Sequence, residues 1–186
     1  MRPPFGHRHG QPHGSAPAPA WRAWEAAQRV MELGTRFVSY VDAGRPEGDA
    51  DAPALVLLHG FPTWSWVWSA VLPGLASSHR VIAPDLLGYG FSDRSDRFDR
   101  SIVRQAEMVV RLLNELGLPK VDLVGHELGG AVALRVATLY PDRVDRLCLV
   151  DAAFYDAFPI DDVVQLGSPA ARRLPVASVL GAARRL

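Results

Sequence analysis

The chain has 186 residues, a length that suits one domain with a substantial buried core. Apolar residues make up 48% of it and charged residues 22%, and its formal net charge of zero disfavours nucleic acid and anionic membranes as partners. Because no apolar run approaches the roughly 18 residues of a membrane span and residues 1–20 lack a signal peptide's apolar stretch, we expect a cytoplasmic protein.

The first part of the chain predicts a tail, a helix and a strand. Residues 1–20 consist mostly of Pro, Gly, His, Ala and Arg, so we expect them to form a disordered tail. Residues 21–33 are expected to form a short helix that ends at Gly34. Residues 35–41 are rich in β-formers and predict an edge strand.

Apolar runs and helical patterns then alternate along the chain. Buried strands are predicted at 54–58 and 80–83 and further strands at 121–124 and 147–150, with helices at 64–75, 102–116 and 128–140. This alternation predicts an α/β fold with a doubly wound, mostly parallel sheet. Cys148 is the single cysteine, which excludes an intramolecular disulfide, and we expect it to be a small core residue of the last strand.

The segment Gly125-His126-Glu127-Leu128-Gly129 follows the third buried run and carries the strongest functional signal. Ligands of parallel sheets bind beyond the carboxyl ends of the strands. A strand that turns sharply into a helix needs small residues around the apex of the turn, and Gly125, Gly129 and Gly130 provide them. We therefore expect Glu127 to project into a cleft near the N-terminus of the following helix.

Three blocks together resemble the α/β-hydrolase superfamily, and most closely its epoxide hydrolase and haloalkane dehalogenase branch. They are His59-Gly60-Phe61-Pro62-Thr63, residues 80–93 and residues 124–130, and the resemblance covers roughly residues 35–160. It implies a hydrolase core over 21–155 and the start of a helical cap over 156–186.

The resemblance also implies roles for individual residues. Glu127 occupies the nucleophile position, and the backbone N–H groups of Phe61 and Leu128 would form the oxyanion hole. Asp151 is a candidate for the acid of the catalytic triad, and Trp64 and Phe154 are candidates for contact with substrate. His59, His126 and Asp85 occupy positions that are structural in this superfamily. We expect a small-molecule substrate, no cofactor and no metal.

Two features depart from the superfamily. Its members carry Ser or Asp at the apex, whereas Glu127 is longer than Asp by one methylene, which displaces the attacking oxygen by about 1 Å and can cost about a hundredfold in rate. Leu128 stands where dehalogenases usually place a halide-binding Trp, a difference that favours the epoxide hydrolases and broader hydrolases. The triad His lies after the last strand in this superfamily, and no histidine follows His126 here.

These features leave two hypotheses. The first is a hydrolase that acts on a small apolar ester, epoxide or alkyl halide through Glu127. The alternative is a catalytically inactive, truncated hydrolase-like fragment or binding module that lacks the triad His. A truncated sheet would expose an apolar edge, which predicts self-association. A nucleotide-binding domain is disfavoured, because no Gly-x-Gly-x-x-Gly motif follows a strand and there is no P-loop lysine.

Overall fold

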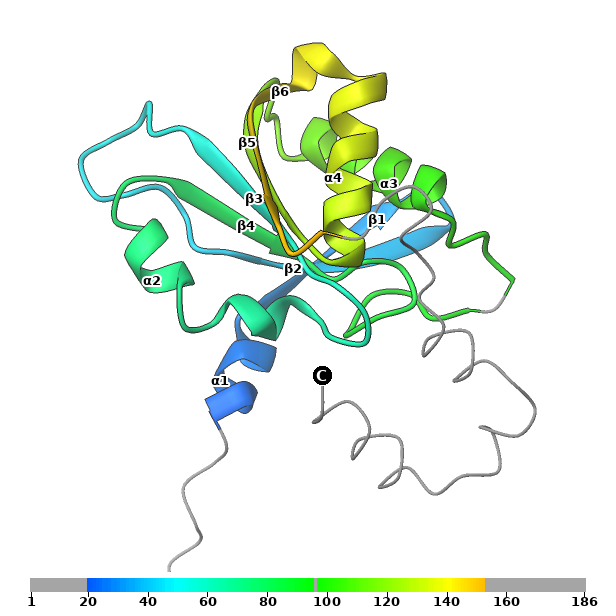
Figure 1. The fold of residues 1–186 in the computed structure, drawn as a ribbon. Coiled ribbons are helices and arrows are strands. Elements are labelled where there is room, and N and C mark those ends of the chain that lie inside the picture. Colours follow the sequence, from blue (N-terminus) through cyan, green and yellow to red (C-terminus); the bar gives the residue numbers. More distant parts are fainter. Residues whose placement is uncertain (1–19, 96, 153–186) are drawn as a thin grey trace, which may run out of the picture.

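The computed structural model describes residues 20–95 and 97–152, and Figure 1 shows their arrangement. The helices are α1 (Ala20–Ala26), α2 (Leu72–Leu75), α3 (Ile102–Glu115) and α4 (Leu128–Leu139), with 3-10 turns η1 (Ser65–Trp68) and η2 (Pro141–Arg143). The strands are β1 (Gln28–Leu33), β2 (Arg36–Asp42), β3 (Ala54–Leu58), β4 (Arg80–Pro84), β5 (Val121–His126) and β6 (Val144–Val150). The expected tail and cap segment lie outside the described residues, apart from Ala20.

The strands of the described part form one sheet in the order β1-β2-β4-β3-β5-β6. Strands β4, β3, β5 and β6 run parallel to one another, whereas β1 and β2 form an antiparallel hairpin that joins the sheet beside β4. The predicted α/β fold with a mostly parallel sheet is therefore confirmed, and the four predicted apolar strands all lie in the parallel part of the sheet.

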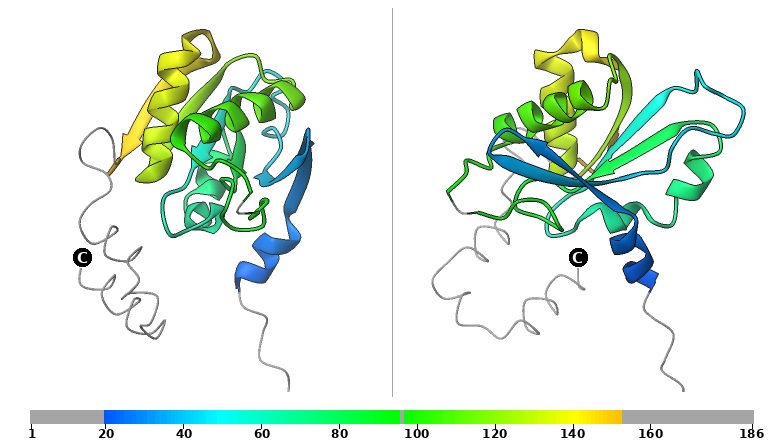
Figure 2. Two further views of the ribbon diagram at one scale, coloured as in Figure 1. Left: turned by 90° about the vertical axis from the view of Figure 1, so that its right-hand side faces the viewer. Right: turned by 180° about the vertical axis from the view of Figure 1, so that it is seen from behind.

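Helices cover both faces of this sheet (Figure 2). Val56 and Leu58 of β3 belong to the core that includes residues of α3 and α4, whereas Leu55 and Leu57 belong to a second core with Trp24 of α1. Successive side chains of a strand point to opposite faces. Because both faces are covered, β3 must be apolar at every position, which explains its continuous apolar run.

The N-terminal expectation was wrong over residues 28–33, which form a strand rather than the end of a helix. The helix stops at Ala26, and Gln28–Leu33 pairs with Arg36–Asp42 across a two-residue turn. Gly34 occupies the left-handed region in this turn, with φ of +73°, which suits glycine. Pairing along the whole of β2 satisfies backbone groups that a short helix would leave exposed, and it makes β1 the edge strand instead of β2.

The helix expected over 64–75 is also corrected, since this segment contains a 3-10 turn and one short helix. Pro73 lies in the first turn of α2 rather than in its last turn. A proline lacks a backbone N–H, and the first turn of a helix does not need that donor.

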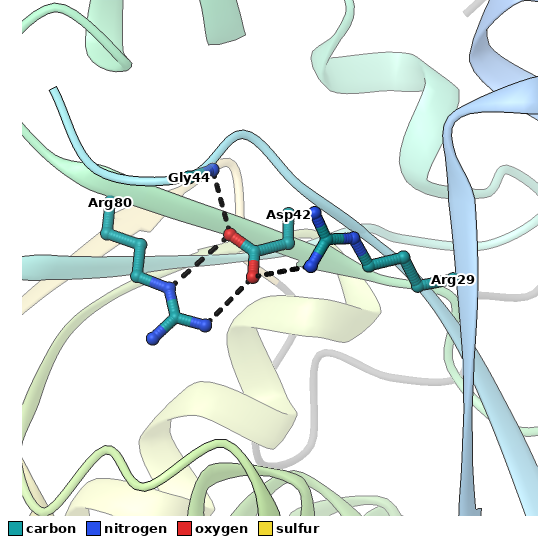
Figure 3. Close-up of polar contacts among 4 residues, drawn as sticks. All are labelled: Arg29, Asp42, Gly44 and Arg80. Atoms are coloured by element: carbon teal, nitrogen blue, oxygen red, sulfur yellow. Dashed lines mark hydrogen bonds and ion pairs between the residues drawn. The ribbon is translucent and has the colours of Figure 1, made fainter. Parts of the chain in front are cut away.

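Asp42, at the end of β2, connects three strands (Figure 3). Its carboxylate accepts hydrogen bonds from the Arg80 side chain of β4, with distances of 2.8 Å from Nη2 and 3.4 Å from Nε. The backbone N–H of Gly44 donates to the same carboxylate at 2.9 Å, and Nη1 of Arg29 on β1 lies 3.5 Å from it. Burial alone raises the pKa of Asp42, but these hydrogen bonds and the two guanidinium charges outweigh it and lower the pKa.

Strand β6 lies at the other edge of the sheet from the hairpin, and its outer side has no paired strand among residues 20–152 that the structure describes. Leu147, Leu149 and Val150 are 37%, 37% and 41% exposed. Cys148 is exposed as well, so its expected core position was wrong. The physical reason is that α4 contacts β6 but leaves the side chains of residues 147–150 exposed. None of the described helices is long and apolar enough to span a membrane.

Candidate active site

The sheet topology brings two loops together at its carboxyl edge. The chain leaves β3 toward β4 through η1 and α2 on one face, and leaves β4 toward β5 through α3 on the other. Strand β3 therefore lies where the direction of the connections reverses, and ligands of open α/β sheets bind at such a point. His59-Gly60-Phe61 follows β3 there, and Glu127 follows the neighbouring strand β5.

Glu127 forms the sharp turn between β5 and α4, and residues 125–129 are called the elbow below. Its φ of 50° and ψ of −116° are strained for a residue with a side chain. A Cβ on Gly129 would overlap the carbonyl oxygens of Leu58 and His59, and one on Gly125 would lie 2.6 Å from Cα of Gly130. The expected need for small residues around this apex is thus confirmed, because the turn is packed directly against the neighbouring backbone.

The two backbone N–H groups expected to form an oxyanion hole converge on the Glu127 side chain. The N–H of Phe61 donates to Oε2 at 2.6 Å, and the N–H of Leu128 donates to the same oxygen at 2.5 Å. No hydrogen bond joins Oε1 to any residue in the part of the chain that the structure describes. One carboxylate oxygen is therefore held between two backbone donors.

Gly60 contributes to this geometry, and its role was not foreseen from the sequence. A Cβ on Gly60 would lie 2.6 Å from Cβ of Glu127, 2.7 Å from its Oε2 and 3.0 Å from the carbonyl oxygen of His126. Only a glycine lets the loop after β3 approach the apex closely enough for the Phe61 N–H to reach the carboxylate. Its place in the His59-Gly60-Phe61-Pro62 block was the only signal in the sequence.

His59 is fully buried, and both of its ring nitrogens are engaged. Nε2 accepts a hydrogen bond from the N–H of Leu86 at 2.9 Å, so Nδ1 carries the proton and donates to the carbonyl oxygen of Gly60 at 3.0 Å. Burial lowers the pKa of His59, which keeps the ring neutral. His59 therefore positions the loops after β3 and β4.

Asp85 is also buried and holds loops rather than a ligand. Its two carboxylate oxygens accept hydrogen bonds from the backbone N–H groups of Ser65 and Phe91, at 2.9 and 2.8 Å. The buried side chain of Gln105 on α3 bonds both backbone groups of Leu87 in the same loop. The structural role expected for Asp85 is borne out by these contacts.

Tyr89 is a second residue near the apex that sequence reasoning did not single out. Its ring lies edge-on to the rings of His59 and Phe61, with centroid distances of 5.4 and 6.5 Å. Burial raises the pKa of the Tyr89 hydroxyl, and the negative charge of Glu127 raises it further, against the opposing effect of Arg100. A protonated, half-buried phenol thus lies within electrostatic reach of the Glu127 carboxylate.

No hydrogen bond or ion pair joins the side chains of the other described candidate residues to the Glu127 side chain. The His126 ring lies edge-on to Trp68, with a centroid distance of 6.3 Å, and its Nδ1 has no hydrogen-bond partner among the described residues. Asp151 follows β6 with a φ of 42° and is exposed. Trp64 packs edge-on to Phe91 at 5.1 Å and stacks with Trp66. The other substrate candidate, Phe154, lies outside the described residues.

The chain is similar in sequence and fold to known proteins. A family model described as alpha/beta hydrolase fold matches residues 53–174. A haloalkane dehalogenase of Mycobacterium marinum is 40% identical over 114 residues, which are 60% of this chain and 37% of that protein. The crystal structure of Cfl2 from Burkholderia cenocepacia is 31% identical, with a TM-score of 0.66 and coverage of 85% of this chain and 55% of that chain.

The crystal structure of haloalkane dehalogenase DbeA from Bradyrhizobium elkani USDA94 is 32% identical. Its TM-score is 0.61, with coverage of 67% of this chain and 41% of that chain. The chain spans little more than a third of the length of two haloalkane dehalogenases among its curated relatives, namely 37% of one and 36% of the other.

Proposed function

Because this chain belongs to the α/β-hydrolase fold family, we propose that Glu127 is a carboxylate nucleophile that attacks a saturated carbon of a small apolar alkyl halide or epoxide. The observation that carries this proposal is the pair of hydrogen bonds from Phe61 and Leu128 to the same oxygen, Oε2. They orient the carboxylate and direct its second oxygen, Oε1, away from the two donors.

The proposed first step forms an alkyl ester on Glu127. A lone pair of Oε1 makes the new carbon–oxygen bond while the carbon–halogen bond breaks and the halide leaves with its electron pair. For an epoxide, the ring oxygen takes the electron pair and then a proton. Oε2 becomes the carbonyl oxygen of the ester, still bound by the N–H groups of Phe61 and Leu128.

The second step would be hydrolysis of this ester by water. Attack on the ester carbon places negative charge on Oε2, where two backbone donors are already aligned to stabilise it. Removing one such donor typically costs about a hundredfold or more in rate. The Phe61 and Leu128 groups would therefore serve both steps, first as an orienting clamp and then as the oxyanion hole.

An ester substrate fits this arrangement less well than an alkyl halide or epoxide. A serine-type mechanism needs the oxyanion hole free for the carbonyl oxygen of the substrate, whereas here Oε2 of Glu127 occupies it. The relatives named as haloalkane dehalogenases favour the alkyl halide among the substrates considered.

A second candidate function is binding or a single alkylation without turnover. It is favoured by the histidines: His59 uses both ring nitrogens in structural hydrogen bonds, and His126 packs against Trp68. No histidine of the described residues contacts Glu127 to activate the water of the second step. We expect the ester to form on this chain and to be hydrolysed slowly.

Mass spectrometry of the intact chain tests the proposal. After incubation, the mass should increase by one butyl group with 1-bromobutane or by one hydroxyhexyl group with 1,2-epoxyhexane, and peptide mapping should locate that group on Glu127. Glu127→Gln keeps a side chain that can accept both hydrogen bonds but removes the nucleophile, so it should form no adduct. Glu115→Gln, at an exposed position of α3, is the matched control and should react like the wild type.

Released bromide separates the two candidate functions. One bromide per chain indicates single alkylation, whereas continued release indicates turnover. Bromide release that is unchanged in Glu127→Gln, or an adduct that maps elsewhere, contradicts the proposed nucleophile. Hydrolysis of p-nitrophenyl acetate that depends on Glu127 would instead favour acyl transfer.

A further inference from the structure

A pocket of about 400 Å³ lies apart from the elbow, between the β1–β2 hairpin, residues 97–99 and residues 104–111 of α3. Phe61, Glu127 and Leu128 do not line it. Four arginines do, and they come from three separate segments: Arg36 from β2, Arg97 from the loop before α3, and Arg104 and Arg111 from α3. A volume of this size is within the range of small-molecule sites.

The carboxylates of the pocket do not balance these arginines. Asp99 and Glu107 both pair with Arg104, with nitrogen–oxygen distances of 3.6 and 2.7 Å. Arg97 and Arg111 have no ion pair or side-chain hydrogen bond among residues 20–95 and 97–152. Among the described lining residues, four guanidinium groups and two carboxylates leave two net positive charges.

Arg36 is held in place without losing its donors. Its guanidinium carbon lies 4.5 Å from the centre of the Phe98 ring, a cation–π contact that leaves the edge N–H groups free. Beside the arginines, the lining contains the apolar side chains Leu33, Val38 and Met108. The pocket thus combines oriented guanidinium groups with an apolar wall.

We propose that this pocket binds a small phosphate monoester. A guanidinium group presents a planar fork of donors that matches phosphate oxygens. At neutral pH a phosphate monoester carries about −1.5 to −2 charges, which balances the two net positive charges of the pocket better than a single carboxylate does. The apolar wall would contact the organic group of the ester. This site is independent of the chemistry at Glu127.

Isothermal titration calorimetry of the full chain with phenyl phosphate tests the proposal, with inorganic phosphate and benzoate as comparison ligands. We expect phenyl phosphate to bind more tightly than either, because it alone provides both the charge and the apolar group. The affinity should fall as sodium chloride is added. Replacing Arg97 and Arg111 together by Gln should weaken binding about tenfold or more, since charge-assisted hydrogen bonds are lost.

The double variant Arg22→Gln and Arg135→Gln is the matched control. It removes the same charge from exposed helix positions outside the pocket and should bind phenyl phosphate like the wild type. If both double variants bound phenyl phosphate equally weakly, the loss of affinity would follow from net charge alone, and the proposal would be overturned. The proposal would also be overturned if phenyl phosphate bound no more tightly than chloride at equal ionic strength, or if benzoate bound more tightly than phenyl phosphate. Circular dichroism verifies that each variant is folded.

Discussion

Single residues decide whether Glu127 reaches the two backbone donors, and Gly60 is the clearest example. A Cβ at this position would lie 2.6 Å from Cβ of Glu127 and 3.0 Å from the backbone oxygen of His126. Gly60→Ala should therefore displace the carboxylate and slow alkylation of Glu127 about a hundredfold, the usual cost of a misplacement of about 1 Å. Mass spectrometry over time measures the rate of adduct formation in the variant and in the wild type.

Gly74→Ala is the control for this substitution, because a Cβ there would meet no atom within 4 Å. Glu127 of this variant should be alkylated at the wild-type rate. If Gly60→Ala also reacted at that rate, the close approach of the loop after β3 to Glu127 would not matter for reactivity.

His59 predicts a dependence of stability on pH. Its pKa in the folded state lies below the ordinary value of 6.5, because burial disfavours the charged ring. The unfolded chain therefore binds more protons just below this pH, and the free energy of unfolding should decrease as the pH falls below about 6.5. Above that pH, the contribution of neutral His59 to the free energy of unfolding is fully present. Urea denaturation between about pH 8 and pH 5 measures this trend.

His59→Gln isolates the contribution of the ring. The Gln side-chain oxygen can accept the hydrogen bond from the N–H of Leu86 but does not titrate. The variant should lose part of the pH dependence that the wild type shows in this range. Identical slopes for the two proteins would mean that protonation of His59 does not affect folding.

At the scale of secondary-structure elements, Asp42 joins the hairpin to the parallel part of the sheet (Figure 3). Its side chain is 3% exposed and contacts Arg29 of β1 and Arg80 of β4. Asp42→Asn would leave Arg80 partly buried without its counter-charge, which should lower the free energy of unfolding by about 2 kcal/mol. Urea denaturation near pH 7 measures the difference.

The same carboxylate contributes to stability at low pH. The folded-state pKa of Asp42 lies below its ordinary value of 3.8, so its stabilisation is complete above that value and is lost as the pH falls through the lowered pKa. The free energies of unfolding of the wild type and of Asp42→Asn should therefore converge in acid.

Asp145→Asn is the control and removes a 57% exposed partner of Lys120. It should change the free energy of unfolding little, both near pH 7 and in acid. An equal effect of the two substitutions would contradict the role given to Asp42.

At the scale of the whole molecule, the exposed apolar strand β6 predicts self-association of this chain. An unpaired strand edge with apolar side chains is a surface on which another strand can add. The purified chain should elute from size-exclusion chromatography with light scattering as a dimer or larger species. Leu149→Lys should shift it toward the monomer, because a charge on an edge strand opposes pairing.

Val67→Lys is the control for this substitution. Val67 is 41% exposed, close to the 37% of Leu149, but it belongs to η1, which contacts β3 and β4. It should leave the oligomeric state unchanged. A folded monomer of the wild-type chain would contradict the prediction.

The cytoplasmic location, the absence of nucleic-acid partners and the absence of a cofactor stay predictions.

The sequence by itself determined the parallel strands, the helices α3 and α4 and the elbow. Strands that are buried on both faces require uninterrupted apolar runs, and an amphipathic helix requires its own spacing, so these elements can be recognised locally. The glycines around Glu127 marked the elbow for the same reason, because a strained apex leaves no room for side chains beside it.

Only the tertiary structure decided the remaining features. Residues 28–33 became a strand because β2 offered a pairing partner, and Cys148 became exposed because α4 packs against β6 without covering it. The hydrogen bond from Phe61 to Glu127 joins residues that are 66 positions apart, and the contact of Gly60 with the same side chain is equally remote in sequence. Such contacts depend on how strands are ordered in the sheet, and no local pattern of residues encodes that distance.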